Sequence, residues 1–174
     1  MGETIRMTSA EAAKLLRKLN EELDNMLLME KQSSVFSAAL GEDVESVRPA
    51  YDYGMVQNQI ESLEARIRQV KHAVSSFNLT QEVPGFEGMT IDQMLVYIPQ
   101  LSRRKDKLSL MQQRLPKQRD RVSLARGSQI IDYSYANYDL EAVKADYQKV
   151  FEELSRAQTA LDLVNTTAQL DIPV

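Results

Sequence analysis

The chain has 174 residues, of which 43% are hydrophobic, and its 21 basic and 25 acidic side chains give a net charge of −4. This length predicts one domain with its own core, and the absence of cysteine excludes disulfides, thiolate zinc sites and cysteine nucleophiles. Only six glycines and five prolines favour long helices over a turn-rich β fold. No stretch approaches the roughly 18 uncharged apolar residues of a membrane span, and the amino-terminal residues lack the apolar segment of an export signal. We therefore expect a soluble, cytoplasmic protein without a membrane partner.

The first part of the chain predicts a pair of antiparallel helices. Thr8, followed three residues later by Glu11, is a capping-box pattern, and apolar residues then alternate in steps of three and four to about Leu40. A second helix with the same alternation is expected to begin near Pro49. Because only about eight residues join the two helices, they should pack as a hairpin over residues 8–77.

A connector over residues 78–89 should lead into a third helix. Thr90 and Gln93 form a second capping-box pattern, which places the helix start there. Pro99 lies inside the periodic segment and predicts a kink or a break, because proline lacks the backbone N–H and its ring clashes with the preceding turn. We expect this helix to end before Pro116.

Residues 128–135 are expected to form the single strand, because polar and apolar side chains alternate there and two tyrosines are present. Asp139 is a candidate N-cap for a fourth helix, which completes a second hairpin over residues 90–165 before a short C-terminal tail. The predicted fold is therefore all-α. It is a single domain over residues 1–174, built from two long antiparallel, coiled-coil-like helical hairpins in a four-helix arrangement with one small β element.

A basic stretch runs from residue 103 to residue 126, with nine basic and two acidic side chains. On a helical wheel Arg103, Lys107 and Arg114 fall within roughly 40° of one another, on the side away from the apolar residues. Beyond this helix the stretch continues with Lys117, Arg119, Arg121 and Arg126. A solvated or intersubunit face is the favoured interpretation, and a polyanion-binding or nucleic-acid-binding surface is the alternative. The stretch has no aromatic residue for base stacking and no recognisable nucleic-acid motif, which favours the first interpretation.

Three polar residues interrupt the apolar positions of the first helix, namely Glu30, Ser33 and Ser37. A carboxylate on an apolar face must find a partner, reach water or change its pKa. We expect these residues to mark a break that exposes the helix or fixes its register. A small-ligand or ion site is the alternative.

The residues needed for catalysis are sparse. His72 is the single histidine and lies on the outer side of the second helix, so a surface position is expected. The chain has no G-x-S-x-G nucleophile motif and no phosphate-binding loop, and Gln69 stands where a di-iron Glu-x-x-His motif would need glutamate. We therefore expect no enzymatic activity, no cofactor and no metal site.

The second half of the chain resembles a known family. The segments GMTIDQML, IIDYSY, YDLEAV and LDLVNTTAQL are similar to those of the septicolysin-like family, which comprises small bacterial helical proteins. The matching positions are Gly88, Thr90, Asp139, Leu140, Val143, Asn165, Thr167 and Leu170. The resemblance implies a bacterial protein with a helical fold and does not imply a particular activity.

A structural or protein-interaction role is the function that the sequence favours. A two-helix hairpin buries little apolar surface, and the polar interruptions leave part of that surface without cover. We therefore expect a homo-oligomer, and an unidentified protein partner is a further expectation. Nucleic-acid binding through residues 103–126 is the first alternative, and a ligand or ion site near Glu30 is the second.

Overall fold

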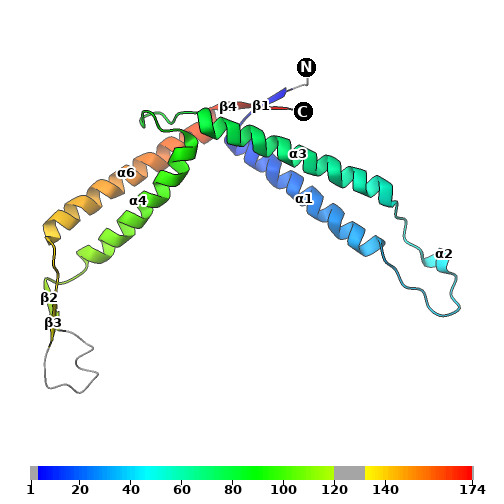
Figure 1. The fold of residues 1–174 in the computed structure, drawn as a ribbon, viewed down its shortest axis with the longest axis horizontal. Helices are drawn as coiled ribbons and strands as arrows, with labels where there is room; N and C mark the ends of the chain where they lie inside the picture. The colour runs from blue at the N-terminus through cyan, green and yellow to red at the C-terminus, as the bar shows by residue number, and fades with distance from the viewer. Residues whose placement is uncertain (1–3, 120–131, 174) are drawn as a thin grey trace. The chain divides into compact units, whose positions relative to one another are not determined.

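A computed structural model describes residues 4–119 and 132–173, and these residues are mainly helical (Figure 1). The chain divides into two compact units. Unit 1 comprises Met1–Gln81 and Leu163–Val174, and unit 2 comprises Glu82–Asp162. The first boundary therefore lies inside the predicted connector, and each unit is described by itself.

Unit 1 combines two long helices with a two-stranded sheet. Its elements are β1 (Thr4–Thr8), α1 (Ser9–Ser33), α2 (Val44–Val47), α3 (Tyr53–Thr80) and β4 (Gln169–Pro173). The helices α1 and α3 pack along each other, while β1 pairs antiparallel with β4 and places Ile5 opposite Ile172. β4 also packs on α3, so the chain's two ends together cover one end of the helix pair.

The capping box predicted at the start of α1 is confirmed. The Thr8 hydroxyl accepts a hydrogen bond from the Glu11 backbone N–H at 3.3 Å, and the Glu11 carboxylate accepts one from the Thr8 backbone N–H at 2.8 Å. These bonds satisfy N–H groups that a helix start leaves without intrahelical partners. α1 therefore begins where the sequence predicts it.

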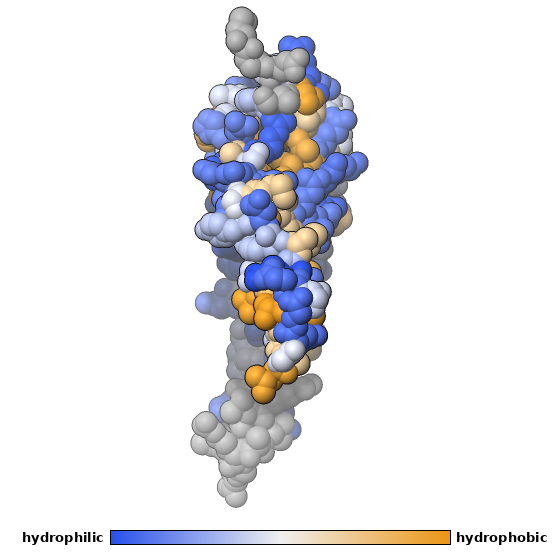
Figure 2. Space-filling view, turned by 90° about the vertical axis from the view of Figure 1, so that its right-hand side faces the viewer, coloured by the Kyte–Doolittle hydropathy of each residue, from blue (hydrophilic) through white to orange (hydrophobic). Residues whose placement is uncertain are grey.

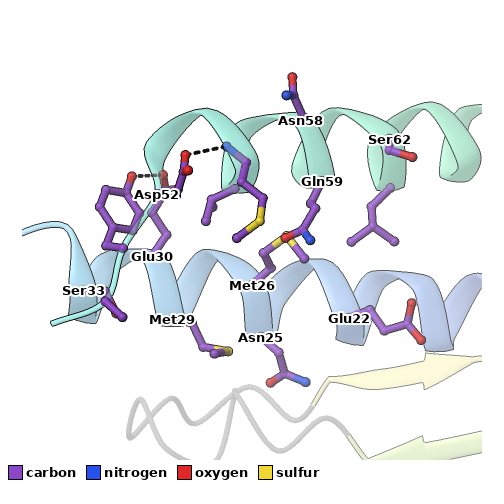
Figure 3. A pocket seen from close by; sticks show the side chains of 15 residues that line it. Glu22, Asn25, Met26, Met29, Glu30, Ser33, Asp52, Asn58, Gln59 and Ser62 are labelled. Atoms are coloured by element: carbon purple, nitrogen blue, oxygen red, sulfur yellow. Dashed lines mark hydrogen bonds between the residues drawn. The ribbon is translucent and has the colours of Figure 1, made fainter.

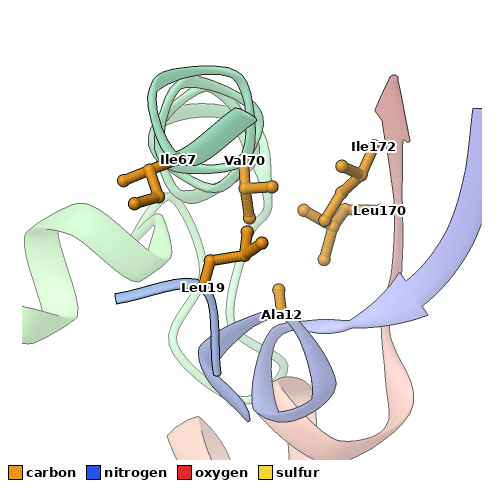
Figure 4. Packing of buried hydrophobic residues seen from close by; sticks show 6 residues of the cluster. All are labelled: Ala12, Leu19, Ile67, Val70, Leu170 and Ile172. Carbon is orange, nitrogen blue, oxygen red and sulfur yellow. The ribbon is translucent and has the colours of Figure 1, made fainter. Parts of the chain in front are cut away.

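The buried core of unit 1 lies beneath the sheet. Figure 4 shows its six side chains, which are Ala12 and Leu19 from α1, Ile67 and Val70 from α3, and Leu170 and Ile172 from β4. Ala12, Val70 and Ile172 are completely buried. Alternate residues of β4 point to the same side, as expected of a strand, and add a third layer to the two helices. The sheet is thus what encloses this end of the helix pair.

The predicted extension of the first helix to Leu40 is wrong, because α1 ends at Ser33. Its last turn is closed by a hydrogen bond from the Ser34 N–H to the Glu30 carbonyl at 2.8 Å. The partner helix α3 begins only at Tyr53. Tyr51, two residues before this start, already contacts Glu30. Beyond this point a longer α1 would have nothing to pack against, and short unpacked helical extensions are not stable in water.

The predicted start of the second helix near Pro49 is also wrong. The residue before a proline is disfavoured in helical conformation, and Arg48 is extended, with φ −66° and ψ 119°. α3 starts at Tyr53 instead, where the Asp52 carboxylate accepts a hydrogen bond from the Met55 N–H at 2.9 Å. A side-chain cap thus decides the start rather than the proline.

Unit 2 contains a second pair of long helices and a small ribbon. Its elements are α4 (Ile91–Gln112), β2 (Lys117–Arg119), β3 (Tyr133–Tyr135) and α6 (Leu140–Thr167), of which the last few residues belong to unit 1. Two hydrogen bonds join the segments: the Tyr97 hydroxyl donates to the Glu153 carboxylate at 3.2 Å, and the Tyr138 hydroxyl donates to the Met111 carbonyl at 2.9 Å. The two helices predicted for this part of the chain, α4 and α6, are both present.

The predicted starts of these two helices are confirmed. The Thr90 N–H donates to the Gln93 side chain at 2.9 Å, and the Gln93 N–H donates to the Thr90 hydroxyl, which completes the capping box of α4. The Asp139 carboxylate accepts a hydrogen bond from the Glu141 N–H at 2.8 Å at the start of α6. Short polar side chains thus fix both helix starts.

Pro99 does not break α4, contrary to one of the two predicted outcomes. The carbonyl that loses its helical donor belongs to Leu95, and Leu95 is exposed, so water can satisfy that group. α4 ends at Gln112, before Pro116 as predicted. Arg114 consequently lies in the turn after the helix rather than on its basic face, which corrects the helical-wheel prediction.

The prediction of a single strand is wrong. β3 lies within the predicted range 128–135, while residues 128–131 fall outside the described part of the chain. β1, β2 and β4 were not predicted, and β4 lies in what was expected to be a short C-terminal tail. β1 and β4 come from opposite ends of the sequence, and a local pattern cannot reveal such a pairing.

Candidate functional site

An open groove lies between the C-terminal half of α1 and the N-terminal half of α3 in unit 1. Its volume is about 880 Å³. Figure 3 shows the α1 wall, which is formed by Glu22, Asn25, Met26, Met29, Glu30 and Ser33. The opposite wall comes from α3 and the residues just before it, including Tyr51, Asp52, Met55, Gln59 and Leu63. The groove thus lies at the end of the helix pair that the sheet does not cover.

Glu30 is the polar centre of this groove and already has partners. One oxygen of its carboxylate accepts hydrogen bonds from the Tyr51 hydroxyl at 2.8 Å and from the Gln57 amide at 2.6 Å. The hydrogen bond to Glu30 raises the pKa of Tyr51 to about 12, with burial and the nearby negative charge adding to the effect. Glu30 therefore links the last turn of α1 to the first residues of the α3 segment.

The three polar residues singled out in the first helix separate in the structure. Ser33 lines the same groove as Glu30. Ser37 lies beyond the end of α1, is exposed and does not line the groove. Tyr51 and Gln57 are the partners that sequence reasoning missed, because they lie on a different segment and no local spacing connects them to Glu30.

Apolar side chains are unusually exposed at this end of unit 1. Met29 is 67% exposed and Met55 is 56% exposed, both on the groove wall. Val35 and Leu40, in the segment that follows α1, are also largely exposed. Figure 2 looks towards this end of unit 1 and shows apolar side chains at the surface among hydrophilic ones. Such a concentration of exposed apolar residues is typical of an interaction surface.

The groove region is also acidic. Residues 22–63, which span all of the lining, contain eight acidic and two basic side chains, a net charge of −6. Glu22 and Asp52 belong to the lining itself, together with Glu30. A surface of this kind attracts basic partners, and methionine side chains adapt to different apolar shapes.

The predicted basic surface is exposed as expected. Arg103 and Lys107 lie on α4, and Arg114 lies in the turn that follows it. None of these three side chains forms an ion pair with another residue in the described ranges 4–119 and 132–173. Lys117 and Arg119 lie on β2, whereas Arg121 and Arg126 fall outside the described residues.

The pairing of β2 with β3 brings tyrosines to the basic stretch. Lys117 lies opposite Tyr135, and Arg119 lies opposite Tyr133. The Lys117 ammonium group lies 4.3 Å from the centre of the Tyr133 ring and 5.4 Å from that of Tyr135, which are cation–π distances. The sequence stretch itself lacks aromatic residues, so these contacts were missed. The alternation of the two tyrosines in the predicted strand was the available signal.

A second polar cluster lies in unit 2 between α4 and α6. The Glu153 carboxylate accepts a hydrogen bond from the Tyr97 hydroxyl and pairs with Arg156 at 2.7 Å, while the Arg156 guanidinium lies 4.8 Å from the centre of the Phe86 ring. Burial raises the pKa of Tyr97, and the charge of Glu153 adds to the effect. The groups satisfy one another, so the cluster holds the connector and helices together and offers no reactive group.

Candidate catalytic and metal-binding residues remain scattered. His72 is exposed on α3, as predicted. Within residues 4–119 and 132–173, no group of three histidine or carboxylate side chains lies close enough together to hold a metal ion. In those same ranges, no helix has the length and apolar character needed to cross a membrane.

Comparison with known proteins gives one solved structure with the same overall fold. It is described as the crystal structure of a functionally unknown conserved protein from Corynebacterium diphtheriae, and it matches with a TM-score of 0.58 over 95% of this chain and 99% of that chain. The two sequences are 17% identical, so the likeness concerns the fold alone. No family model and no curated protein matches the sequence. The chain thus has a mainly helical fold that also occurs in a bacterial protein.

Proposed function

We propose that this chain is a non-catalytic, cytoplasmic protein-interaction protein that assembles with further copies of itself through the groove of unit 1. The observation that carries the proposal is the exposure of Met29 and Met55 on the walls of that groove. Leaving large apolar side chains in water is unfavourable by about 25 cal/mol per Å² relative to burial. An interface would remove this surface from water.

The extent of the exposed apolar surface favours a macromolecular occupant. It continues from the groove walls to Val35 and Leu40 in the segment after α1, which a small molecule bound near Glu30 would leave uncovered. One carboxylate oxygen of Glu30 also already accepts hydrogen bonds from Tyr51 and Gln57. A protein surface could cover the apolar residues without disturbing these hydrogen bonds.

A second copy is the occupant we favour, because the same chain exposes matching chemistry elsewhere. Unit 2 leaves Leu110, Leu115 and Phe151 exposed, and its basic side chains are opposite in charge to the groove region. Self-association would therefore pair apolar with apolar surface and acidic with basic surface. Such complementarity provides both affinity and a defined orientation.

Sedimentation velocity over a range of protein concentrations tests the proposal. The wild-type protein should form an oligomer whose fraction rises with concentration, and the double variant Met29→Asp, Met55→Asp should remain a monomer. Leu79→Asp is the matched control, because Leu79 is equally exposed on α3 but lies outside the groove. A wild-type protein that stays monomeric at every concentration would contradict self-assembly.

Binding of a small cationic ligand is the second candidate function, and the position of Glu30 inside the groove favours it. A ligand carrying an ammonium or guanidinium group could replace the Tyr51 and Gln57 donors at the carboxylate. A melting-temperature screen of small alkylammonium and guanidinium compounds tests this idea. A ligand at this site should raise the melting temperature of the wild-type protein and not that of Glu30→Gln.

Membership of the septicolysin-like family remains a proposal. Two of its matching positions, Thr90 and Asp139, cap α4 and α6, and Gly88 has a positive φ of 76° in the turn before α4. These residues are therefore compatible with a shared helical scaffold. Related sequences that keep these three residues and also the groove methionines would support a common interaction surface.

A further inference from the structure

We propose that the groove of unit 1 receives the basic face of α4 from a second copy, so that the copies associate head to tail. This inference rests on the proposed self-assembly and adds the identity of the two contacting surfaces. The basic α4 face is defined here by Arg103, Lys107 and Leu110, with Arg114 directly after the helix.

The arrangement of the basic α4 face suits insertion into an apolar groove. At about 100° per residue, Leu110 lies within about 20° of Arg103 and about half a turn from Leu101. The exposed fractions of the two side chains agree with these opposite positions, because Leu101 is 3% exposed whereas Leu110 is 67% exposed. A leucine at the centre of a positively charged stripe is therefore presented to solvent. Such a face combines an apolar anchor with flanking charges.

The two sequence regions that carry these surfaces have opposite net charges. The described part of the basic stretch, residues 103–119, contains seven basic and one acidic side chain, a net charge of +6. The groove region, residues 22–63, has a net charge of −6. In the basic stretch Asp106 pairs with Lys105, which leaves the charges of the α4 face available for an intermolecular partner.

The apolar parts of the two surfaces are complementary as well. Leu110 would enter between the methionines of the groove, where Met29 and Met55 are exposed. Methionine has a flexible, unbranched side chain and can pack around a partner that is not perfectly preformed. Arg103 and Lys107 would then face acidic residues on the groove walls, such as Glu22. Electrostatic attraction of this kind sets orientation and association rate, and it weakens with salt.

The two surfaces belong to different units of the chain, so each copy presents both the groove and the basic α4 face. A contact between unlike surfaces is heterologous, and it repeats until a ring closes or a filament grows. Head-to-tail association therefore predicts species larger than a dimer at high concentration, with a size distribution that depends on salt.

Charge reversal and its compensation provide the decisive experiment. Arg103→Glu with Lys107→Glu should weaken self-association about tenfold or more, because like charges would face each other. Glu22→Lys with Asn25→Lys, two exposed positions on the α1 wall of the groove, should have a similar effect. Combining all four substitutions in one chain should restore association, measured by sedimentation velocity at low salt.

The control for charge alone is Lys144→Glu with Lys149→Glu, which makes the same charge change at exposed positions of α6. This control should assemble like the wild-type protein. Failure of the fourfold variant to recover would overturn the proposed docking, even if Met29→Asp, Met55→Asp still abolishes assembly and so supports the groove. A wild-type protein that stays monomeric would overturn both proposals.

Nucleic acid is the competing occupant of the basic face, and the same variants distinguish it. A labelled duplex oligonucleotide is added to the wild-type protein and to Arg103→Glu, Lys107→Glu, at low and near-physiological salt. Absence of binding is expected. If the protein is monomeric and comigrates with the oligonucleotide only when Arg103 and Lys107 are intact, the face binds phosphate and the head-to-tail inference is overturned.

Discussion

The two ends of the α1–α3 pair have the same helical pattern but differ in how far their apolar side chains are buried. At the end covered by the sheet, Ala12, Val70 and Ile172 are completely buried. At the other end Met29 and Met55 remain largely exposed on the walls of an open groove. The difference comes from the third layer, since β4 covers only one end. Two helices can pair along an apolar stripe, but they need a further element to enclose it.

Truncating an apolar side chain should therefore lower the free energy of unfolding much more at the covered end than at the open end. Ile172→Ala should lower the free energy of unfolding by about 3 kcal/mol, because it removes a fully buried side chain that contacts both helices' core residues. Met29→Ala should change it by under about 0.5 kcal/mol in the monomer. Urea denaturation at a concentration below that of self-association measures both values. Equal losses would show that the two ends are not distinct.

The helix start at the covered end is the next most sensitive point. Thr8→Ala removes the side-chain cap of α1 and should cost about 1 kcal/mol of stability. Thr8→Ser keeps the hydroxyl group and serves as the control. Urea denaturation of the three proteins checks the prediction, and an unchanged midpoint for Thr8→Ala would mean that the sheet alone holds this end together.

At the open end the polar contact of Glu30 should be visible as a pH effect. The folded-state pKa of Tyr51 is about 12, above the ordinary value of 10.0, so the stabilisation from its hydrogen bond is complete below pH 10 and is lost as the pH rises through about 12. Glu30→Gln should move the pKa of Tyr51 towards the ordinary value. NMR titration of the Tyr51 ring, assigned with Tyr51→Phe, measures the shift. A pKa near 10 for Tyr51 in the wild-type protein would contradict its hydrogen bond to Glu30.

The smallest effect is expected for the exposed ion pair on the sheet. Arg6 and Asp171 approach to 3.0 Å across β1 and β4, yet both side chains are more than half exposed. Arg6→Ala should change the free energy of unfolding by under about 0.5 kcal/mol, because water and salt screen such pairs. A loss comparable to that of Ile172→Ala would mean that charge rather than burial holds the sheet in place.

Much of the helical framework could be predicted from the sequence, because local chemistry determines it. Thr8, Thr90 and Asp139 each cap a helix where the sequence placed a cap. The errors arose where the outcome depends on partners distant in sequence. α1 ends early because α3 offers no surface beyond Tyr53, and β1 and β4 pair across almost the whole chain.

The candidate site was only partly foreseen, for the same reason. The sequence singled out Glu30 as an acid among apolar positions, and the structure places it in a groove. Its partners Tyr51 and Gln57 come from the segment that returns after α1, so their contribution required the fold. The exposure of Met29 and Met55 was likewise not predictable, because a periodic pattern does not reveal which of its residues will be covered.

Methyl NMR of methionine-labelled protein over a dilution series tests the central claim most directly. Met29 and Met55 report on the groove, and Met94, fully buried in unit 2, is an internal reference. We predict that the Met29 and Met55 signals shift or broaden as the concentration rises, while the Met94 signal stays unchanged. Groove signals that are independent of concentration, in a sample whose size is also constant, would contradict self-association through this surface.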